Sequence, residues 1–439
     1  MAIGPQDNLS PALWGGVECT INRVGDYYSD QVERSRHDQR LSDFTLFADL
    51  GITALRHPVL WEHVERLGWR WADDSLSELA RVHLDPIIGL LHHGSGPPTT
   101  SLLDENFPFK LARHAGAVAE RYPHVDAYTP VNEPLTTARF SALYGHWYPH
   151  ATDDRSFVKA LFLQLKATVL SMQSIRHIQP AARLIQTEDI GETWGTGPLR
   201  HQAEFDNLRR WLTFDFLAGR VDAHHPLVPY LQSSGMAERD LYWFAENPCP
   251  PSVLGVNYYL TSDRFLDHRV QCYPPMMVGG NGHEVYADVE AVRVRPEGIA
   301  GAAVLLAQAW ERYGIPVAIT EVHNGADIEQ QVLWFNEIWA NACLSLRRGV
   351  PVTAVTPWAL VGSYDWRSLV TKRENCYEPG VFRLDTNGIP VPTALAEALR
   401  RAASGKSPLD VDATAWWKAP DRLLYPIQSK SSRSAMKYT

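Results

Sequence analysis

Two glutamates, Glu133 and Glu321, each follow a short run of mostly apolar residues, and this setting suits a pair of catalytic carboxyl groups. Hydrolysis of an acetal needs a proton for the leaving oxygen and a negative group that meets the positive charge growing on the anomeric carbon. Two carboxyl groups in different surroundings supply both, one as general acid and base and the other as nucleophile. A single glutamate in such a place is equally well explained by a salt bridge, so the hypothesis depends on the pair.

Arg56 is the cation that we expect beside Glu321. Its charge would keep the Glu321 carboxylate ionised, because an opposite charge nearby favours the charged form. The anion at Glu321 would in turn favour the protonated form of Glu133. The two pKa values would then separate in the direction that acid and nucleophile require.

These residues must be positioned by a repeated strand-helix pattern, because short β-branched apolar runs alternate with longer stretches of helical periodicity. Eight strands are predicted, over Leu13–Glu18, Ile52–His57, Pro86–His92, Ala127–Asn132, Arg183–Thr187, Val253–Tyr258, Pro316–Thr320 and Val352–Trp358. Helices are predicted between them, including Arg34–Leu50, Phe109–Arg121, Phe157–Ile178, Gly298–Arg312 and Ile328–Arg348. The alternation predicts an α/β fold that closes as a single (β/α)8 TIM barrel.

In such a barrel the reactive groups lie at the C-terminal ends of the strands. Polar or aromatic residues stand at or just beyond the predicted ends: Glu18, Arg56, His93, Asn132, Glu133, Asn257, Tyr259, Thr320, Glu321 and Trp358. We therefore expect one site at that end of the barrel.

The domain organisation is expected to be simple. No Gly/Ser-rich or Pro-rich linker divides the chain, so residues 1–425 are predicted to form one domain. Residues 426–439 end in the polar, basic sequence KSSRSAMKYT and are predicted to form a flexible tail. Whether this tail leads to a further domain is left open.

The composition of the chain argues against several classes of binding partner. The 439 residues carry a formal net charge of −9 with no sustained basic stripe, which argues against nucleic acid or an anionic membrane as partner. The five cysteines include no CxxC pair, so neither a disulfide framework nor a thiolate metal site is indicated, and a cytoplasmic location is expected. No run of about eighteen apolar residues and no signal-like N-terminus is present. The oligomeric state is left open.

Several motifs together resemble glycoside hydrolase family 1, the β-glucosidase and β-galactosidase group. VNEP at Val131–Pro134 is similar to the family's acid/base motif, and AITEVHNG at Ala318–Gly325 is similar to its nucleophile motif. Further matches follow in chain order: LWG at Leu13–Gly15, the Arg–x4–Trp spacing of Arg56 and Trp61, GVNYY at Gly255–Tyr259, RPEGI at Arg295–Ile299 and WALVGSYDW at Trp358–Trp366.

The resemblance implies a retaining β-glycoside hydrolase that forms a covalent glycosyl-enzyme intermediate on a small carbohydrate or glycoside, with no metal and no cofactor. It makes Glu133 the acid/base, Glu321 the nucleophile and Asn132 the partner of the sugar 2-hydroxyl. The implied substrate-binding residues are Asn22, Arg56, His93, Asn132, Asn257, Tyr259, Trp358, Asp365 and Trp366.

The sequence departs from the family pattern at three sugar-binding positions. Asn22 stands where the family has Gln, Asp365 where it has Glu, and Gly94 where it has Trp. Each change shortens or removes a side chain, so we expect a wider pocket and poor activity on a simple glucoside. Two extra residues, Val322 and His323, follow the proposed nucleophile and leave the geometry of that loop open.

Three alternatives stay open at this point. A metal-dependent barrel hydrolase would use His57, His92, His93 and Asp189, although their spacing lacks an HxH pair. A sugar-binding barrel with little turnover would keep the carboxyl groups within an altered pocket. A transglycosylase would pass the covalent sugar to an alcohol in place of water.

Overall fold

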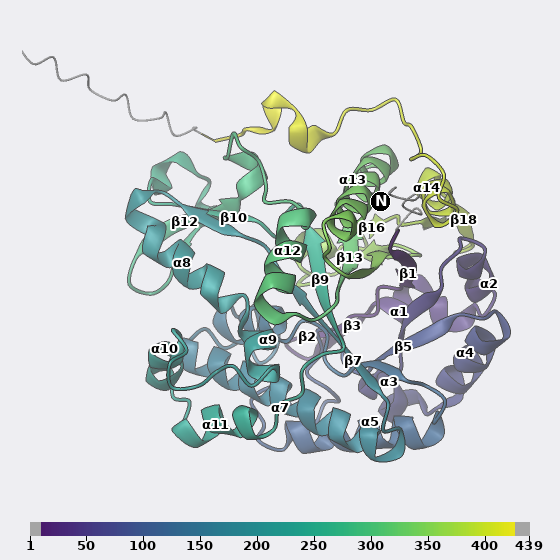
Figure 1. Cartoon of the computed structure of the whole chain (residues 1–439), viewed down its shortest axis with the longest axis horizontal. Helices are drawn as coiled ribbons and strands as arrows, with labels where there is room; N and C mark the ends of the chain where they lie inside the picture. Colours follow the sequence, from purple (N-terminus) through teal and green to yellow (C-terminus); the bar gives the residue numbers. More distant parts are fainter. Residues whose placement is uncertain (1–9, 426–439) are drawn as a thin grey trace, which may run out of the picture. The chain divides into compact units, whose positions relative to one another are not determined.

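The computed structural model describes residues 10–425, and its central feature is a closed barrel of eight parallel strands (Figure 1). Around the barrel the strands follow the order β1 (Ala12–Gly16), β14 (Val352–Pro357), β13 (Val317–His323), β9 (Val253–Tyr259), β7 (Arg183–Asp189), β6 (Ala127–Thr129), β5 (Asp85–Gly89) and β4 (Ala54–Pro58). Each predicted strand overlaps one of these eight, and the predicted (β/α)8 barrel is confirmed.

One layer of the barrel core takes a residue from every strand. This buried cluster consists of Trp14, Ala54, Ile87, Ala127, Ile185, Val253, Ala318 and Ala354. A single large indole among small and branched side chains fills the interior, so the barrel centre is packed at this level. The site must therefore lie above this layer, at the strand ends.

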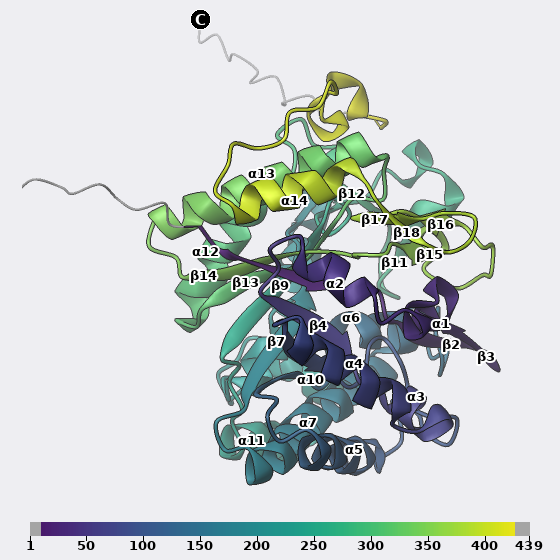
Figure 2. The ribbon, with the colours of Figure 1, turned by 90° about the vertical axis from the view of Figure 1, so that its right-hand side faces the viewer.

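Helices surround the barrel strands, and neighbours in the ring pack in pairs. The helices of the barrel unit are α1 (Gln31–Ser35), α2 (Asp43–Ala48), α3 (Trp61–Leu67), α4 (Arg70–Arg81), α5 (Phe107–Arg121), α6 (Pro134–Ala138), α7 (Asp154–Ile178), α9 (Leu212–Leu217), α10 (Val228–Ser233), α11 (Glu238–Glu246), α12 (Ala302–Tyr313), α13 (Ile328–Arg347) and α14 (Ala394–Ala403). Helix α5 packs against α7, and Figure 2 shows α14 lying along α13. No helix within residues 10–425 combines the length and the apolar character needed to cross a bilayer.

The helix predicted over Arg34–Leu50 is wrong as a single element. The chain forms α1, a short 3₁₀ turn and α2 instead, because Arg36 adopts a left-handed conformation with φ of 54°. The Arg40 guanidinium donates to the Ser35 carbonyl at 2.8 Å and so binds the end of α1. Buried Asp43 joins the same turn through His37 Nδ1 at 2.8 Å. Side-chain bonds to the backbone here replace the continuous helical ladder.

Two antiparallel hairpins in the barrel unit carry predicted sugar-binding residues. Asn22 lies on β2 (Ile21–Val24), which pairs with β3 (Tyr27–Asp30). Asp365 directly follows β15 (Ser363–Tyr364), which pairs with β16 (Tyr377–Glu378). A third small hairpin joins β17 (Phe382–Leu384) and β18 (Pro390–Pro392).

A second compact unit is built from residues 191–207, 260–300 and 414–425. Its four-stranded sheet has the order β11 (Val278–Gly280), β12 (Val285–Glu290), β10 (Arg264–Asp267) and β8 (Thr193–Gly195). Helix α8 (Arg200–Arg209) leads from this unit back into the barrel unit. One domain over residues 1–425 stays a prediction, and the tail predicted at 426–439 lies outside the described residues.

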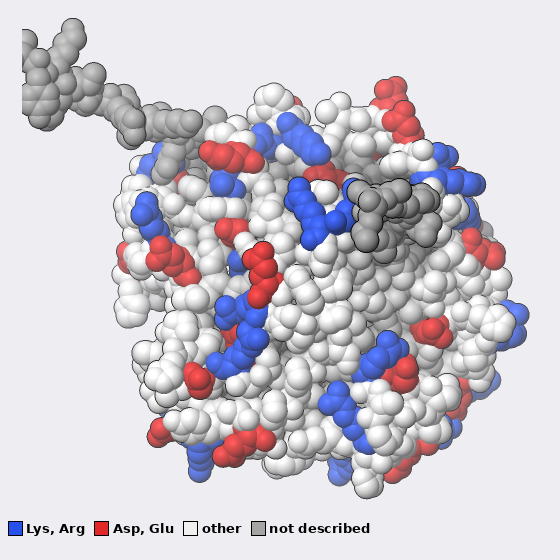
Figure 3. Space-filling view, viewed as in Figure 1, with Lys and Arg blue, Asp and Glu red and all other residues white. Residues whose placement is uncertain are grey.

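Charges of both signs are mixed on the face shown in Figure 3, where no large patch of one sign appears. That distribution agrees with the absence of a basic stripe in the sequence.

Candidate active site

Glu133 stands at the junction between strand and helix. It follows β6 and immediately precedes α6, with a left-handed backbone at φ of 44°. His93, which follows β5, is also left-handed at φ of 54°. Non-glycine residues rarely adopt this conformation, and where they do the strain is often concentrated at functional sites.

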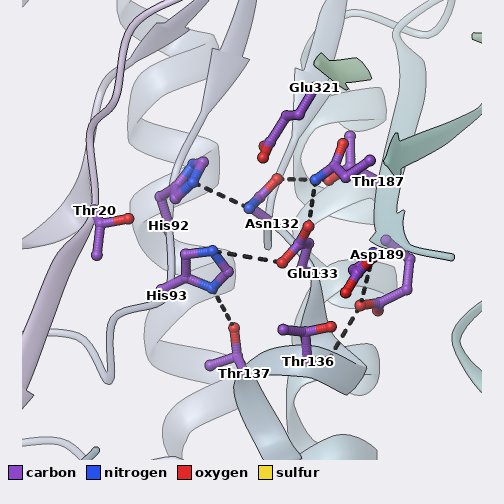
Figure 4. Close-up of polar contacts among 12 residues, drawn as sticks. Thr20, His92, His93, Asn132, Glu133, Thr136, Thr137, Thr187, Asp189 and Glu321 are labelled. Atoms are coloured by element: carbon purple, nitrogen blue, oxygen red, sulfur yellow. Dashed lines mark hydrogen bonds and ion pairs between the residues drawn. The ribbon is translucent and has the colours of Figure 1, made fainter. Parts of the chain in front are cut away.

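The Glu133 side chain is buried and held by an amide (Figure 4). Asn257 Nδ2 donates to Glu133 Oε1 at 2.5 Å, and His93 Nε2 lies 3.5 Å from Glu133 Oε2. Thr320 Oγ1 donates to Asn257 Oδ1 at 2.6 Å, which directs the amide NH2 group toward Glu133. The amide orientation is thus set by a neighbouring strand.

Glu321 lies on β13 directly opposite Asn257 of β9, in register with it. Its Oε1 accepts from Arg56 Nη1 at 2.7 Å, and its Oε2 accepts from the Tyr259 hydroxyl. Arg56 also donates to Asn132 Oδ1 at 2.6 Å, so one guanidinium joins the proposed nucleophile to the residue that precedes Glu133. Register and contacts together bring both glutamates to one region of the barrel mouth.

Asn132 has a fixed orientation because both ends of its amide are bound. Its Oδ1 accepts from Thr187 Oγ1 at 2.7 Å as well as from Arg56, and its Nδ2 lies 3.1 Å from His92 Nε2. The His92 ring stacks on Trp358, with centroids 5.4 Å apart.

Sequence reasoning missed several members of this network. His92, Thr187 and Thr320 each contact a predicted site residue, although none of them was predicted to bind the sugar. Glu18 accepts from Trp358 Nε1 at 3.0 Å and so holds the indole in place. Glu18 and Thr320 could have been found from the sequence, since both stand near predicted strand ends. His92 and His93 are adjacent, so the sequence alone does not show which of the two side chains faces the site.

The electrostatics of the two carboxyl groups differ in their causes. Burial raises the pKa of Glu133 well above its usual range, and the charges of Glu321, Asp189 and Glu188 raise it further. Burial also raises the pKa of Glu321, to about 7, while Arg56 and Tyr259 oppose that rise. We therefore expect Glu133 to keep its proton at a pH at which Glu321 has lost its own.

His93 does not supply a positive charge to Glu133. Burial and the charge of Arg56 lower the pKa of His93 to about 3, so the imidazole is neutral near pH 7. Its Nδ1 lies 2.9 Å from Thr137 Oγ1, which fixes the ring. The other nitrogen then faces Glu133 as a neutral hydrogen-bonding group.

At two of the three positions with shortened side chains, Asn22 and Asp365, the side chain forms hydrogen bonds within the protein. Asn22 Nδ2 donates to the Val370 carbonyl at 3.1 Å. The fully buried Asp365 carboxylate accepts from Arg34 at 2.7 Å and from three backbone amides of its own loop, those of Glu374, Asn375 and Cys376. Asp365 therefore acts as the centre of its loop in this structure.

The third position, Gly94, has no spare room. A Cβ at Gly94 would lie 2.2 Å from Glu62 Oε1, because the buried Glu62 carboxyl occupies that space. Glu62 Oε1 accepts from the Gly96 amide at 3.1 Å. Glu62 therefore fills the space beside Gly94, and the wider pocket stays a prediction. The predicted Trp366 lies nearby, with its ring 5.7 Å from that of His93.

The two extra residues after Glu321 extend β13. Val322 pairs with Pro357 of β14, and His323 pairs with Tyr259 of β9. His323 Nε2 lies 3.4 Å from Glu378 Oε2 of β16. The insertion thus continues β13, with register shifts between Ile319 and Glu321 on the β9 side and between Ile319 and Val322 on the β14 side. No group of three or more His, Cys, Asp and Glu side chains that could hold a metal ion occurs among residues 10–425.

Comparisons with known proteins give a structural likeness alone. No family model matches the sequence, and no curated protein matches it. The family 1 β-glucosidase from Thermotoga maritima is similar in structure, with a TM-score of 0.72 and 14% identity over 92% of this chain and 100% of that chain. The β-glucosidase from the same organism in complex with methoxycarbonyl-substituted glucoimidazole gives 0.73 and 15% over 91% and 99%. At this identity the likeness establishes the shared fold.

Proposed function

We propose that this protein is a retaining β-glycoside hydrolase of the β-glucosidase type. The observation that carries the proposal is the different surroundings of two buried carboxyl groups at one barrel mouth. Glu321 is bound by Arg56 and Tyr259, whereas Glu133 is bound by the neutral Asn257 and faces other anions. These surroundings suit a nucleophile and an acid in the two-carboxylate mechanism.

In the first step the Glu321 carboxylate attacks the anomeric carbon and forms a glycosyl ester. The bond to the leaving oxygen breaks, and Glu133 gives its proton to that oxygen. In the second step the Glu133 carboxylate takes a proton from water, the water oxygen attacks the anomeric carbon, and Glu321 leaves as carboxylate. Asn132, fixed by Arg56 and Thr187, is placed to bind the sugar 2-hydroxyl.

The substrate class is a small carbohydrate or glycoside. The Thermotoga maritima β-glucosidase has been crystallised with noeuromycin and with cyclophellitol, and its barrel spans nearly all of this chain. An alcohol that enters in the second step in place of water would yield transglycosylation from the same intermediate. Product analysis with and without added alcohol separates the two outcomes.

The anomer formed with azide tests both roles. With an activated aryl β-glycoside, Glu321→Gly should lose at least roughly a thousandfold in kcat, and azide should restore part of it as the α-glycosyl azide. Glu133→Gly with azide should give the β-glycosyl azide, because azide then attacks the covalent intermediate from the opposite face.

Glu378→Gly serves as the control, because this glutamate lies beside His323 on β16, outside the barrel sheet, and has no part in the proposed chemistry. It should keep turnover near that of the unaltered protein. Turnover that survives Glu321→Gly would overturn the assignment. Sugar binding without any product from the unaltered protein would identify a binding barrel instead.

A further inference from the structure

Glu188 is a fully buried carboxyl group whose two oxygens accept hydrogen bonds from four donors. It lies near the end of β7, next to Asp189. Its Oε2 accepts from the Leu135 amide at 2.9 Å and from Thr213 Oγ1 at 2.8 Å. Its Oε1 accepts from the amides of Thr136 and Asp189, at 3.1 and 3.3 Å.

This donor set fits an ionised carboxylate. Three of the four partners are backbone N–H groups, which cannot accept a proton from a carboxylic acid. Burial raises the pKa of Glu188 above its ordinary value, and its bonds to Leu135, Thr213 and Thr136 and the charge of Arg139 limit that rise. A buried carboxylate with several amide donors keeps its charge more readily than one without them.

Glu188 also binds the first turn of α6, the helix that Glu133 precedes. Glu133 precedes that helix, yet its own side chain makes no capping bond to the helix amides. The free amides of a first helical turn need an acceptor, and the Glu188 carboxylate receives those of Leu135 and Thr136. Glu188 therefore fixes the turn from which the strained Glu133 backbone enters α6.

We propose that Glu188 is a positioning residue for Glu133, which it orients through α6 and beside which it supplies a second buried negative charge. The inference rests on the proposed function, because it assumes that Glu133 donates the proton. Glu188 touches neither substrate nor reacting atoms, so its influence must pass through Glu133.

Several groups face Glu133 and must be counted in its titration. Glu321 approaches from β13, Glu188 and Asp189 from β7, Asn257 from β9 and His93 from the segment after β5. The three anions raise the pKa of Glu133, and the bond from Asn257 lowers it. Removal of one anion should therefore let Glu133 lose its proton at lower pH.

The test is the pH dependence of kcat/KM for an aryl β-glycoside with a poor leaving group. Its basic limb reports loss of the proton from the general acid. Glu188→Gln keeps the shape and removes the charge, so the basic limb should move to lower pH by on the order of half to one unit. Because one amide end of the Gln cannot accept, kcat should also fall by about tenfold.

Two further variants separate charge from position. Thr213→Val removes one bond to the Glu188 carboxylate and leaves its charge, so the melting temperature should fall while the basic limb stays in place. Glu188→Asp keeps the charge on a shorter side chain, so the limb should stay and kcat should fall.

A folded Glu188→Gln protein with an unmoved basic limb would overturn the inference. If that variant does not fold, Glu188→Asp decides, because a shifted limb with the charge retained would also overturn it. Failure of the proposed function looks different, since Glu321→Gly and Glu133→Gly would then give no glycosyl azide when azide is added.

Discussion

The strand ends of the barrel and the three shortened positions around them use their polar groups in opposite ways. At the strand ends, the Arg56 guanidinium binds both Asn132 and Glu321. At the outer positions, the Asp365 carboxylate accepts hydrogen bonds from its own loop, and the Glu62 side chain fills the space beside Gly94. The strand-end side chains thus bind one another's partners within one cluster, whereas the side chains of the outer positions bind or fill the surrounding chain.

Asn22 lies between these two cases. Its amide nitrogen is used by the Val370 carbonyl, but its buried Oδ1 has no hydrogen-bond partner among the described residues. One acceptor therefore remains for a ligand at this position. The contrast between inner and outer residues predicts different readouts: changes at strand ends should alter turnover, and changes at outer positions should alter stability.

The largest effect is expected at Arg56. Arg56→Met leaves the buried Glu321 carboxyl without its cation and removes the bonds to Asn132 and Thr320 O. Because Arg56 binds the proposed nucleophile directly and holds its charge, kcat/KM should fall by roughly a hundredfold to a thousandfold or more. The pKa of Glu321 should rise, which moves the acidic limb of the profile to higher pH.

Arg56→Lys is the matched control, because it keeps the charge and loses the fork that reaches Asn132. Its acidic limb should stay closer to that of the unaltered protein. If Arg56→Met kept the kcat/KM of the unaltered protein, the expectation that strand-end residues control turnover would be wrong.

The strand ends were predictable because a parallel barrel fixes which end of each strand meets the others. Once the apolar runs were located, the residues after them, such as Glu133, Glu321 and Arg56, had to converge, and the eight strands are confirmed. Their catalytic and sugar-binding roles stay predictions. The register that places Asn257 opposite Glu321 needed coordinates, since a strand boundary is uncertain by a few residues.

The outer positions were unpredictable because their partners come from distant parts of the chain. Asp365 is bound by Arg34, 331 residues away, and Asn22 by the Val370 carbonyl, 348 residues away. No local pattern encodes such pairs. Glu188 was overlooked for a related reason, since its acceptor role depends on where α6 begins.

The second largest effect concerns the pH dependence of stability at Glu62. Burial raises the pKa of Glu62 from its ordinary 4.5 to about 7. A raised carboxyl pKa favours the folded state while the group is protonated, so this stability is fully present below about pH 4.5 and is lost as pH rises through about 7. Glu62→Gln removes that dependence. Its free energy of unfolding should gain on the unaltered protein between pH 5 and pH 8, by at most roughly 3 kcal/mol.

Urea unfolding at the two pH values measures this gain. An equal difference between the two proteins at pH 5 and pH 8 would show that Glu62 is not held protonated, and that position 94 is filled by an ordinary carboxylate. Turnover should change much less than stability, in keeping with an outer position.

A smaller effect is expected at Asp365. Asp365→Asn weakens the charge-assisted bond from Arg34 and cannot accept with both side-chain ends, so unfolding should become easier by about 1.5–3 kcal/mol. Arg34→Met should give part of the same loss, and the double variant should lose less than the sum because the two residues share one contact. A raised KM with unchanged stability would instead identify Asp365 as a sugar contact.

The smallest effect is expected at Asn22. A change there tests most directly whether a residue at an outer position affects stability, turnover or both. Asn22→Ala removes the bond to the Val370 carbonyl and should cost about 1 kcal/mol of unfolding free energy. Because the buried Asn22 Oδ1 has no hydrogen-bond partner among the described residues, KM should rise as well, by about threefold to tenfold, while kcat stays within about twofold. Thermal unfolding and steady-state kinetics on the same preparation measure both. A fall in kcat as large as that of Arg56→Met would place Asn22 with the strand-end residues, and an unchanged KM would place it wholly with the residues that hold the chain.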